Sequence, residues 1–180
     1  MATTARPATE EDLLRMPRDG QKYELVDGEI RVSPAGGQHG GVCVRLILQL
    51  GGFVLQQQLG QVFDSSTGFR FPGGNIRVPD VSFVARGRLA DERPPVGFLE
   101  VPPDLAVEVL SPHDRADYAL DRVGEYLDAG VRLVWLIDPR ERAAVVHRSL
   151  TEVRRLGPED FLDGEDVVPD FRCRLADVID

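Results

Sequence analysis

The sequence has little cysteine, no excess of basic residues and no long apolar run. Its 180 residues include two cysteines, Cys43 and Cys173, which lie far apart and show no Cys-x-x-Cys spacing. This usage argues against a zinc site and suits a reducing cytoplasm. No apolar run approaches the roughly 20 residues that a membrane span needs, and the N-terminus lacks a basic region followed by an apolar stretch. We therefore expect a cytoplasmic protein without a membrane segment or a secretory signal.

The charge balance is acidic, with 30 Asp and Glu against 21 Lys and Arg and a net charge of −9. Proteins that bind nucleic acid usually carry a basic surface, and the overall composition shows none. A role on nucleic acid would therefore rest on a local basic patch or on metal ions that offset the repulsion. The length and the 42% hydrophobic content predict one globular domain over residues 1–180.

Local patterns predict an α/β fold. The turn-forming pair Asp27-Gly28 joins two short apolar segments and predicts a hairpin, because both turn positions need a positive φ. We expect residues 36–41 to form a glycine-rich break, 86–103 a long loop, and the acidic tail after Gly157 to be loop-rich. Hydrophobic periodicity predicts helices over 9–16, 42–59 and 114–129, and strands over 22–26, 29–32, 61–71, 76–84, 104–110, 133–137 and 143–148.

The predicted strand over 104–110 contains a carboxylate in an apolar setting. Its period of two directs Leu105, Val107 and Val109 to one face, and Ala106 and Leu110 to the other together with Glu108. A carboxylate between apolar neighbours is costly unless it is paired or binds a metal. Glu108 is therefore the first candidate for a functional residue.

A second acid, Asp80, follows Pro79 at the start of a strand and lies 28 residues before Glu108. Two carboxylates on neighbouring strands can share a Mg²⁺ ion, which prefers oxygen ligands. The backbone carbonyl of Val109 offers a third oxygen. A metal held in this way can polarise a phosphodiester and lower the pKa of an attacking water.

Several motifs in a fixed order resemble one family. They are Tyr23-Glu-Leu-Val-Asp-Gly-Glu-Ile, Arg77-Val-Pro-Asp-Val-Ser-Phe-Val, Pro103-Asp-Leu-Ala-Val-Glu-Val-Leu-Ser-Pro, Glu125-Tyr126 and Gly130-Val-Arg-Leu-Val-Trp-Leu-Ile-Asp-Pro. Together they resemble the Uma family of restriction-endonuclease-like proteins, within the PD-(D/E)xK nuclease superfamily. The resemblance implies a restriction-endonuclease-like mixed sheet flanked by helices, with an N-terminal β-hairpin. It also implies Asp80 and Glu108 as metal-binding acids and Mg²⁺-dependent hydrolysis of DNA, with Mn²⁺ as a substitute.

The chain departs from the superfamily signature two residues after Glu108, where Leu110 stands in place of lysine. In the family that this chain resembles, the lysine comes from the following helix, and the matching position here is Arg122. Arginine keeps the positive charge but cannot act as a base. We therefore expect Arg122 to orient a water or a phosphate oxygen.

Each candidate also has a purely structural interpretation. Asp80 after a proline can be a turn residue, Glu108 can be a strand charge paired with an arginine, and Arg122 can be a solvated side chain at the border of its helix. The remaining interpretations concern residues of lesser weight: Glu24 as an exposed hairpin residue or a fourth acid, His39 as a loop or helix-start residue, Trp135 as core, and Cys43 and Cys173 as inert thiols.

Three functions therefore remain open. The first is a Mg²⁺-dependent DNA endonuclease, expected to be a homodimer because cutting both strands takes two sites. The second is a nuclease-like binding or scaffold module with weak or no catalysis, favoured by the acidic charge and by the missing lysine. The third is hydrolysis of a smaller phosphoester, which needs no long basic groove.

Overall fold

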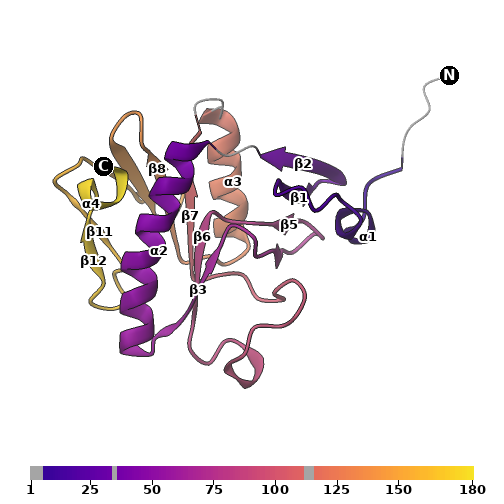
Figure 1. The fold of residues 1–180 in the computed structure, drawn as a ribbon, viewed down its shortest axis with the longest axis horizontal. Coiled ribbons are helices and arrows are strands. Elements are labelled where there is room, and N and C mark those ends of the chain that lie inside the picture. The colour runs from indigo at the N-terminus through magenta and orange to yellow at the C-terminus, as the bar shows by residue number, and fades with distance from the viewer. Residues whose placement is uncertain (1–5, 34–35, 112–115) are drawn as a thin grey trace.

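The computed structural model describes residues 6–33, 36–111 and 116–180 (Figure 1). The helices are α1 (Glu10–Leu14), α2 (Gly37–Gln57), α3 (Ala116–Asp128) and α4 (Ala176–Ile179), with one 3₁₀ turn, η1 (Ala90–Glu92). The strands are β1 (Lys22–Val26), β2 (Glu29–Ser33), β3 (Gly60–Asp64), β4 (Phe69–Arg70), β5 (Ile76–Arg77), β6 (Val81–Ala85), β7 (Leu105–Val109), β8 (Leu133–Asp138), β9 (Ala143–His147), β10 (Val153–Leu156), β11 (Phe161–Asp163) and β12 (Arg172–Arg174).

A mixed six-stranded sheet in the order β10-β9-β8-β7-β6-β3 forms the centre of the fold. Only β7 and β8 are parallel among its described strand pairs, and α3 lies in the chain between them. A parallel pair needs such a crossover, because a short turn can join only antiparallel strands. The expected mixed sheet flanked by helices is confirmed.

Two helices cover opposite faces of this sheet (Figure 1). On one face, Leu105 and Val107 of β7 pack with Leu46 and Leu50 of α2. On the other face, Ala106 packs with apolar residues of α3 such as Val123 and Tyr126. The alternation that the sequence predicts for residues 105–109 therefore places Glu108 on the α3 face. Trp135 of β8 is fully buried, as expected.

The N-terminal hairpin is confirmed and belongs to a second sheet in the order β2-β1-β5-β4. Val26 pairs with Glu29 across the turn, where Asp27 has a φ of 51° and Gly28 a φ of 75°. These values suit the tight turn that Asp-Gly favours. The hairpin positions the side chains of β1 near the carboxyl end of β7.

Several boundaries differ from the expected ones. The two segments predicted as continuous strands, 61–71 and 76–84, are each divided between the two sheets, as β3 and β4 and as β5 and β6. The glycine-rich break predicted over residues 36–41 is wrong from Gly37 onward, because these residues form the first turn of α2. The predicted helix over 114–129 is confirmed from Ala116 to Asp128, and its first two expected residues lie outside the described ones.

The C-terminal tail is more ordered than its composition predicts. Strands β11 and β12 pair with each other, and β10 pairs with β9. Leu175, Val178 and Ile179 join the apolar cluster beneath α2. Burial of these side chains explains the order, because a short helix gains most of its stability from packing.

Candidate active site

Asp80 lies directly before β6 and is held next to the end of β7. Its backbone N–H donates to the carbonyl of Val107 at 3.0 Å. Its buried carboxylate accepts three hydrogen bonds of 2.9 Å, from Nζ of Lys22 to Oδ1, and from Nε2 of His39 and the N–H of Val109 to Oδ2. Burial alone would raise the pKa of Asp80, but Lys22, His39 and the Val109 amide hold it well below its usual value.

Glu108 points from β7 toward α3 and is also buried. Its Oε2 accepts a hydrogen bond from Nη1 of Arg122 at 2.5 Å, and its Oε1 accepts one from the hydroxyl of Tyr126. Burial raises the pKa of Glu108, while Arg122 and Lys22 oppose the rise. The two α3 side chains thus fix both oxygens of this carboxylate.

Lys22 on β1 joins the two acids. Its Nζ lies 2.9 Å from Oδ1 of Asp80 and 4.0 Å from Oε2 of Glu108. Burial lowers the pKa of Lys22, but the two carboxylates together raise it above its usual value, so the amine stays charged. Lys22 is the one lysine in the entire sequence. That rarity is a sequence signal for this residue, although no local pattern marks Lys22 as part of the site.

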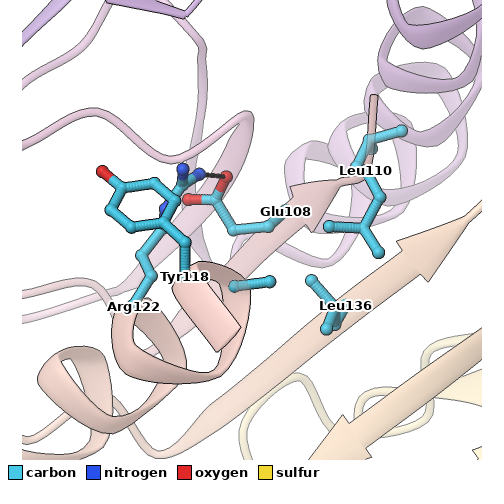
Figure 2. Close-up of a pocket in the computed structure, with 7 residues that line it drawn as sticks. Glu108, Leu110, Tyr118, Arg122 and Leu136 are labelled. Atoms are coloured by element: carbon cyan, nitrogen blue, oxygen red, sulfur yellow. Dashed lines mark hydrogen bonds and ion pairs between the residues drawn. The ribbon is translucent and has the colours of Figure 1, made fainter. Parts of the chain in front are cut away.

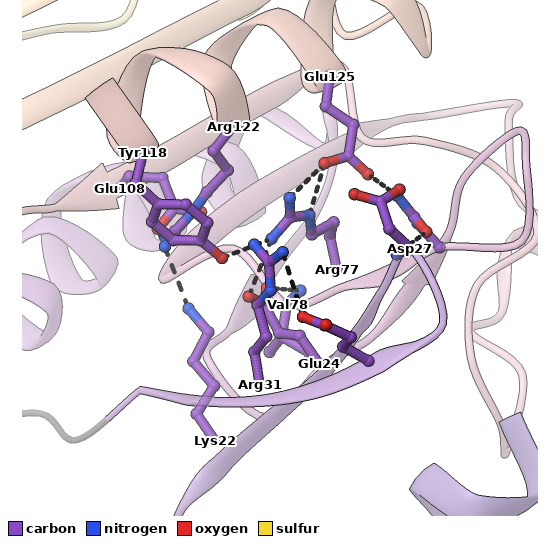
Figure 3. A network of polar contacts seen from close by, with 12 residues as sticks. Lys22, Glu24, Asp27, Arg31, Arg77, Val78, Glu108, Tyr118, Arg122 and Glu125 are labelled. Carbon is purple, nitrogen blue, oxygen red and sulfur yellow. Dashed lines mark hydrogen bonds and ion pairs between the residues drawn. The ribbon is translucent and has the colours of Figure 1, made fainter. Parts of the chain in front are cut away.

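A second buried network lies beside the first, around Arg77 of β5 (Figure 3). Glu24 is buried, and it accepts hydrogen bonds from the N–H of Val78 at 2.8 Å and from Arg77 at 3.3 Å. Arg77 also donates to Glu125 at 2.8 Å and to the hydroxyl of Tyr118 at 3.2 Å. Glu24 is therefore not an exposed hairpin residue, and its carboxylate accepts hydrogen bonds from the Arg77 side chain and from the Val78 backbone.

A small pocket opens beside Glu108, between β7, β8 and α3 (Figure 2). The guanidinium carbon of Arg122 lies 5.0 Å from the ring centre of Tyr118, so the ring stacks on the cation that binds Glu108. This stacking and the ion pair together limit the motion of Arg122. The pocket is lined by Glu108, Val109, Leu110, Tyr118, Ala119, Arg122 and Leu136.

His39 reaches Asp80 from the first turns of α2. Its Nδ1 lies 3.7 Å from Sγ of Cys43, one helical turn later. The hydrogen bond to Asp80 raises the pKa of His39 from 6.5 to about 10, and the Cys43 contact adds to the rise. His39 does start a helix, as one interpretation of the sequence held, but its contact with Asp80 was not expected.

The structure thus brings the predicted site residues together at one end of the central sheet. Asp80 lies in a bend after Pro79, as its structural interpretation held, but its carboxylate is buried. Arg122 is buried instead of solvated, so its structural interpretation is wrong. Glu108 is paired with an arginine, as its structural interpretation held, and that arginine is Arg122. Burial raises the pKa of Cys173 to about 12, in keeping with an inert thiol.

The donor chemistry of this cluster fits a divalent cation. Asp80 and Glu108 approach one ammonium group from adjacent strands, so their oxygens already converge on one positive charge. Such hard oxygen donors are the ligands that Mg²⁺ and related ions prefer.

Within the described residues, no helix is both long enough and apolar enough to cross a membrane.

Comparison with solved structures shows a shared fold. A protein from Anabaena variabilis, described as a "putative nuclease", is 22% identical, with a TM-score of 0.83 over 96% of this chain and 98% of that one. A DrdV–DNA complex is 14% identical over 66% of this chain and 12% of that one, with a TM-score of 0.36 that is too low to indicate a common fold. No curated protein matches the chain.

Comparison with protein families gives a match over nearly the whole chain. Residues 10–176 match the Uma2 family, whose description is "Putative restriction endonuclease". The matched range contains the hairpin, both acids and α3. It confirms the resemblance that the sequence motifs indicate, and the chain belongs to the Uma2 family.

Proposed function

We propose that the protein is a metal-dependent endonuclease that hydrolyses DNA phosphodiester bonds at Asp80 and Glu108. The observation that carries this proposal is the convergence of the two buried carboxylates on the ammonium of Lys22. Two buried acids next to each other are costly, and charge compensation by Lys22, His39 and Arg122 keeps them in place. Membership of a family described as a restriction endonuclease supports the same function.

Asp80, Glu108 and the Val109 carbonyl are the groups that would hold the metal. Mg²⁺ is the proposed ion, with Mn²⁺ as a substitute, because the donors are oxygens. When bound there, such an ion polarises the phosphate and lowers the pKa of an attacking water. Binding requires Lys22 to leave Oδ1 of Asp80, since a second cation at that atom would repel the ion.

Two cationic side chains then act on the substrate and on the acids. Lys22 reaches both carboxylates and supplies the amine that Leu110 cannot offer at the signature position. Its raised pKa keeps it charged, so it donates hydrogen bonds to a phosphate oxygen or to the water oxygen and is not the base. Arg122 holds Glu108 in place by a hydrogen bond from α3. It also stabilises the negative charge that develops on the phosphate.

The proposal includes DNA as the partner, a homodimer and a cytoplasmic location. A dimer suits the reaction because cutting both strands of a duplex takes two sites. A reducing compartment also suits two unpaired cysteines, both of which are buried.

A second candidate function is a nuclease-like binding module with weak or no catalysis. One observation favours it: the groove between the hairpin and α3 is lined by four acids, Asp27, Asp121, Glu125 and Asp128, against two cations, Arg31 and Arg77. These acids would repel a phosphate backbone. Under this alternative the cations at Asp80 and Glu108 serve stability alone, and no added metal elicits cleavage.

A plasmid-nicking assay at low salt with Mg²⁺ or Mn²⁺ separates the two candidates. We expect the wild type to nick the plasmid, and Asp80→Asn and Glu108→Gln to lose this activity. Glu152→Gln, which changes an exposed acid on the turn between β9 and β10, is the matched control and should cut normally. Cleavage of a small phosphodiester without cleavage of the plasmid would instead favour a smaller phosphoester as substrate. Absence of metal-dependent activity on both would favour the binding module.

A further inference from the structure

The cluster around Asp80 contains a nitrogen donor that the carboxylate site does not use. Nε2 of His39 lies 2.9 Å from Oδ2 of Asp80, and the side chain of His39 is only 12% exposed. Lys22 contacts the other oxygen, Oδ1, so each oxygen of the Asp80 carboxylate has one of the two side chains as its partner. Histidine differs from lysine here, because its Nε2 proton can leave to solvent as a metal binds, and the neutral imidazole then offers a lone pair at Nε2.

The surroundings of His39 resemble those of a metal-binding histidine. Cys43 lies four residues later on the same face of α2, and its Sγ is 3.7 Å from Nδ1. A ring that binds a metal through Nε2 carries its proton on Nδ1, and an acceptor at Nδ1 fixes the orientation of the ring. One donor atom each from His39, Cys43 and Asp80 lies within 4.8 Å of the others.

The start of α2 lies at the protein surface. Gly36, Gly37 and Gly40 are exposed, and a side chain added at any of them would meet no atom within 4 Å. The side chain of His39 is itself 12% exposed, so it is accessible to solvent. An entry path is one of the features that a metal site needs.

We propose that His39 is a third protein ligand, through Nε2, of the ion assigned to Asp80 and Glu108, and that it makes this site prefer a first-row transition metal to Mg²⁺. The inference rests on the proposed function and deepens it by replacing Mg²⁺ with a transition metal such as Mn²⁺ as the preferred ion. Mg²⁺ takes oxygen ligands almost exclusively, whereas imidazole nitrogen suits transition metals. Cys43 acts as the partner that orients the ring.

Electron paramagnetic resonance of bound Mn²⁺ tests this assignment without relying on activity. We expect the wild type to bind Mn²⁺ with a nitrogen coupling that changes when histidine is labelled with ¹⁵N. His39→Gln should lose this coupling. Loss of an outer partner of a metal ligand typically lowers affinity about 10- to 100-fold, so loss of the ligand should lower Mn²⁺ affinity at least about tenfold.

Competition with Mg²⁺ tests the predicted metal preference. His39→Asp replaces the nitrogen by an oxygen donor, so Mg²⁺ should displace Mn²⁺ from this variant more readily than from the wild type. Circular dichroism of each variant verifies that the fold is intact. Cys43→Ser, which keeps a hydrogen-bonding group, should retain the nitrogen coupling.

The outcomes separate this inference from the proposed function. Mn²⁺ bound without nitrogen coupling, and with equal affinity in the wild type and His39→Gln, would show that His39 only pairs with Asp80 and would overturn the inference. Asp80→Asn and Glu108→Gln would still lose Mn²⁺ in that case, and the proposed function would stand. Unchanged Mn²⁺ affinity in these two variants as well would overturn both.

Discussion

Lys22 and Asp80 are 58 positions apart in the sequence, yet Nζ of Lys22 lies 2.9 Å from Oδ1 of Asp80. The ammonium is also 4.0 Å from Oε2 of Glu108. A positive charge of the chain itself therefore lies where a divalent ion would meet the two acids. Under the proposed function, Lys22 would compete with the metal and then act on the substrate.

Replacing Lys22 by Gln should separate these two effects. Mn²⁺ affinity should rise, because a like charge is removed from Asp80. The cleavage rate at saturating Mn²⁺ should fall on the order of a hundredfold, which is typical for the loss of one donor to the transition state. Arg18→Gln removes an exposed positive charge just before the hairpin and serves as the control. Equal cleavage by Lys22→Gln and the wild type would exclude a role for Lys22 in the reaction.

Arg122 should matter for both cleavage and stability. Arg122→Ala should lower metal-dependent cleavage on the order of a hundredfold, whereas Arg122→Lys should retain or raise it. The alanine variant also leaves a buried carboxylate without its closest cation, a change that costs about 3–5 kcal/mol of the free energy of unfolding. Urea unfolding and cleavage rates at saturating Mn²⁺ measure the two effects. If Arg122→Ala cuts as fast as the wild type, Arg122 only pairs with Glu108 and takes no part in the reaction.

The contact between His39 and Asp80 should make stability depend on pH in the alkaline range. The pKa of His39 rises from 6.5 to about 10 in the folded protein, so the folded state holds the proton more tightly than the unfolded state. The contact therefore stabilises the protein fully below about pH 6.5, and this stabilisation is lost as the pH rises toward 10.

Urea unfolding of metal-free wild type and His39→Gln at pH 6, 8 and 10 measures this dependence. The wild type should exceed the variant in stability most at pH 6, and the difference should shrink with rising pH. A difference that stays constant over this range would show that the proton on His39 is not coupled to folding. Nuclear magnetic resonance of the imidazole signals gives the pKa of His39 independently.

DNA binding should be weak without a divalent ion and should fall steeply with salt. The net charge of −9 opposes the approach of a phosphate backbone, and contacts between cations and phosphates lose affinity as salt rises. Fluorescence anisotropy of a labelled duplex at several salt concentrations, with and without Ca²⁺, measures both dependences. Tight binding that does not change with salt would contradict this account.

The sequence predicts those parts of the site that local chemistry determines. Glu108 could be singled out because its strand pattern places a charge among apolar side chains, and Asp80 because an acid precedes a strand in the same motif order. Both side chains are buried, although the burial of Asp80 was not predicted. The helix with Arg122 could be predicted from its apolar stripe. In the structure this stripe packs on the central sheet.

Contacts between distant segments could not be predicted in the same way. The pairings of Lys22 and His39 with Asp80 depend on how the hairpin and α2 meet the central sheet, which no local pattern specifies. α2 begins at Gly37 despite the low helix propensity of glycine, because the packing of Val42 and Leu46 in the core outweighs that propensity. The order of the tail likewise comes from burial of Leu175 and its neighbours, not from local propensity.

The central claim is that Asp80 and Glu108 hold one divalent ion, and calorimetric titration with Mn²⁺ tests it most directly. The wild type should bind Mn²⁺ at one site per chain, and Asp80→Ala, Glu108→Ala and the double variant should all lose this binding while remaining folded, because each change removes a charged oxygen ligand. Glu152→Ala should bind as the wild type does. Equal Mn²⁺ affinity in the wild type and the double variant would contradict the account, because the ion would then bind elsewhere.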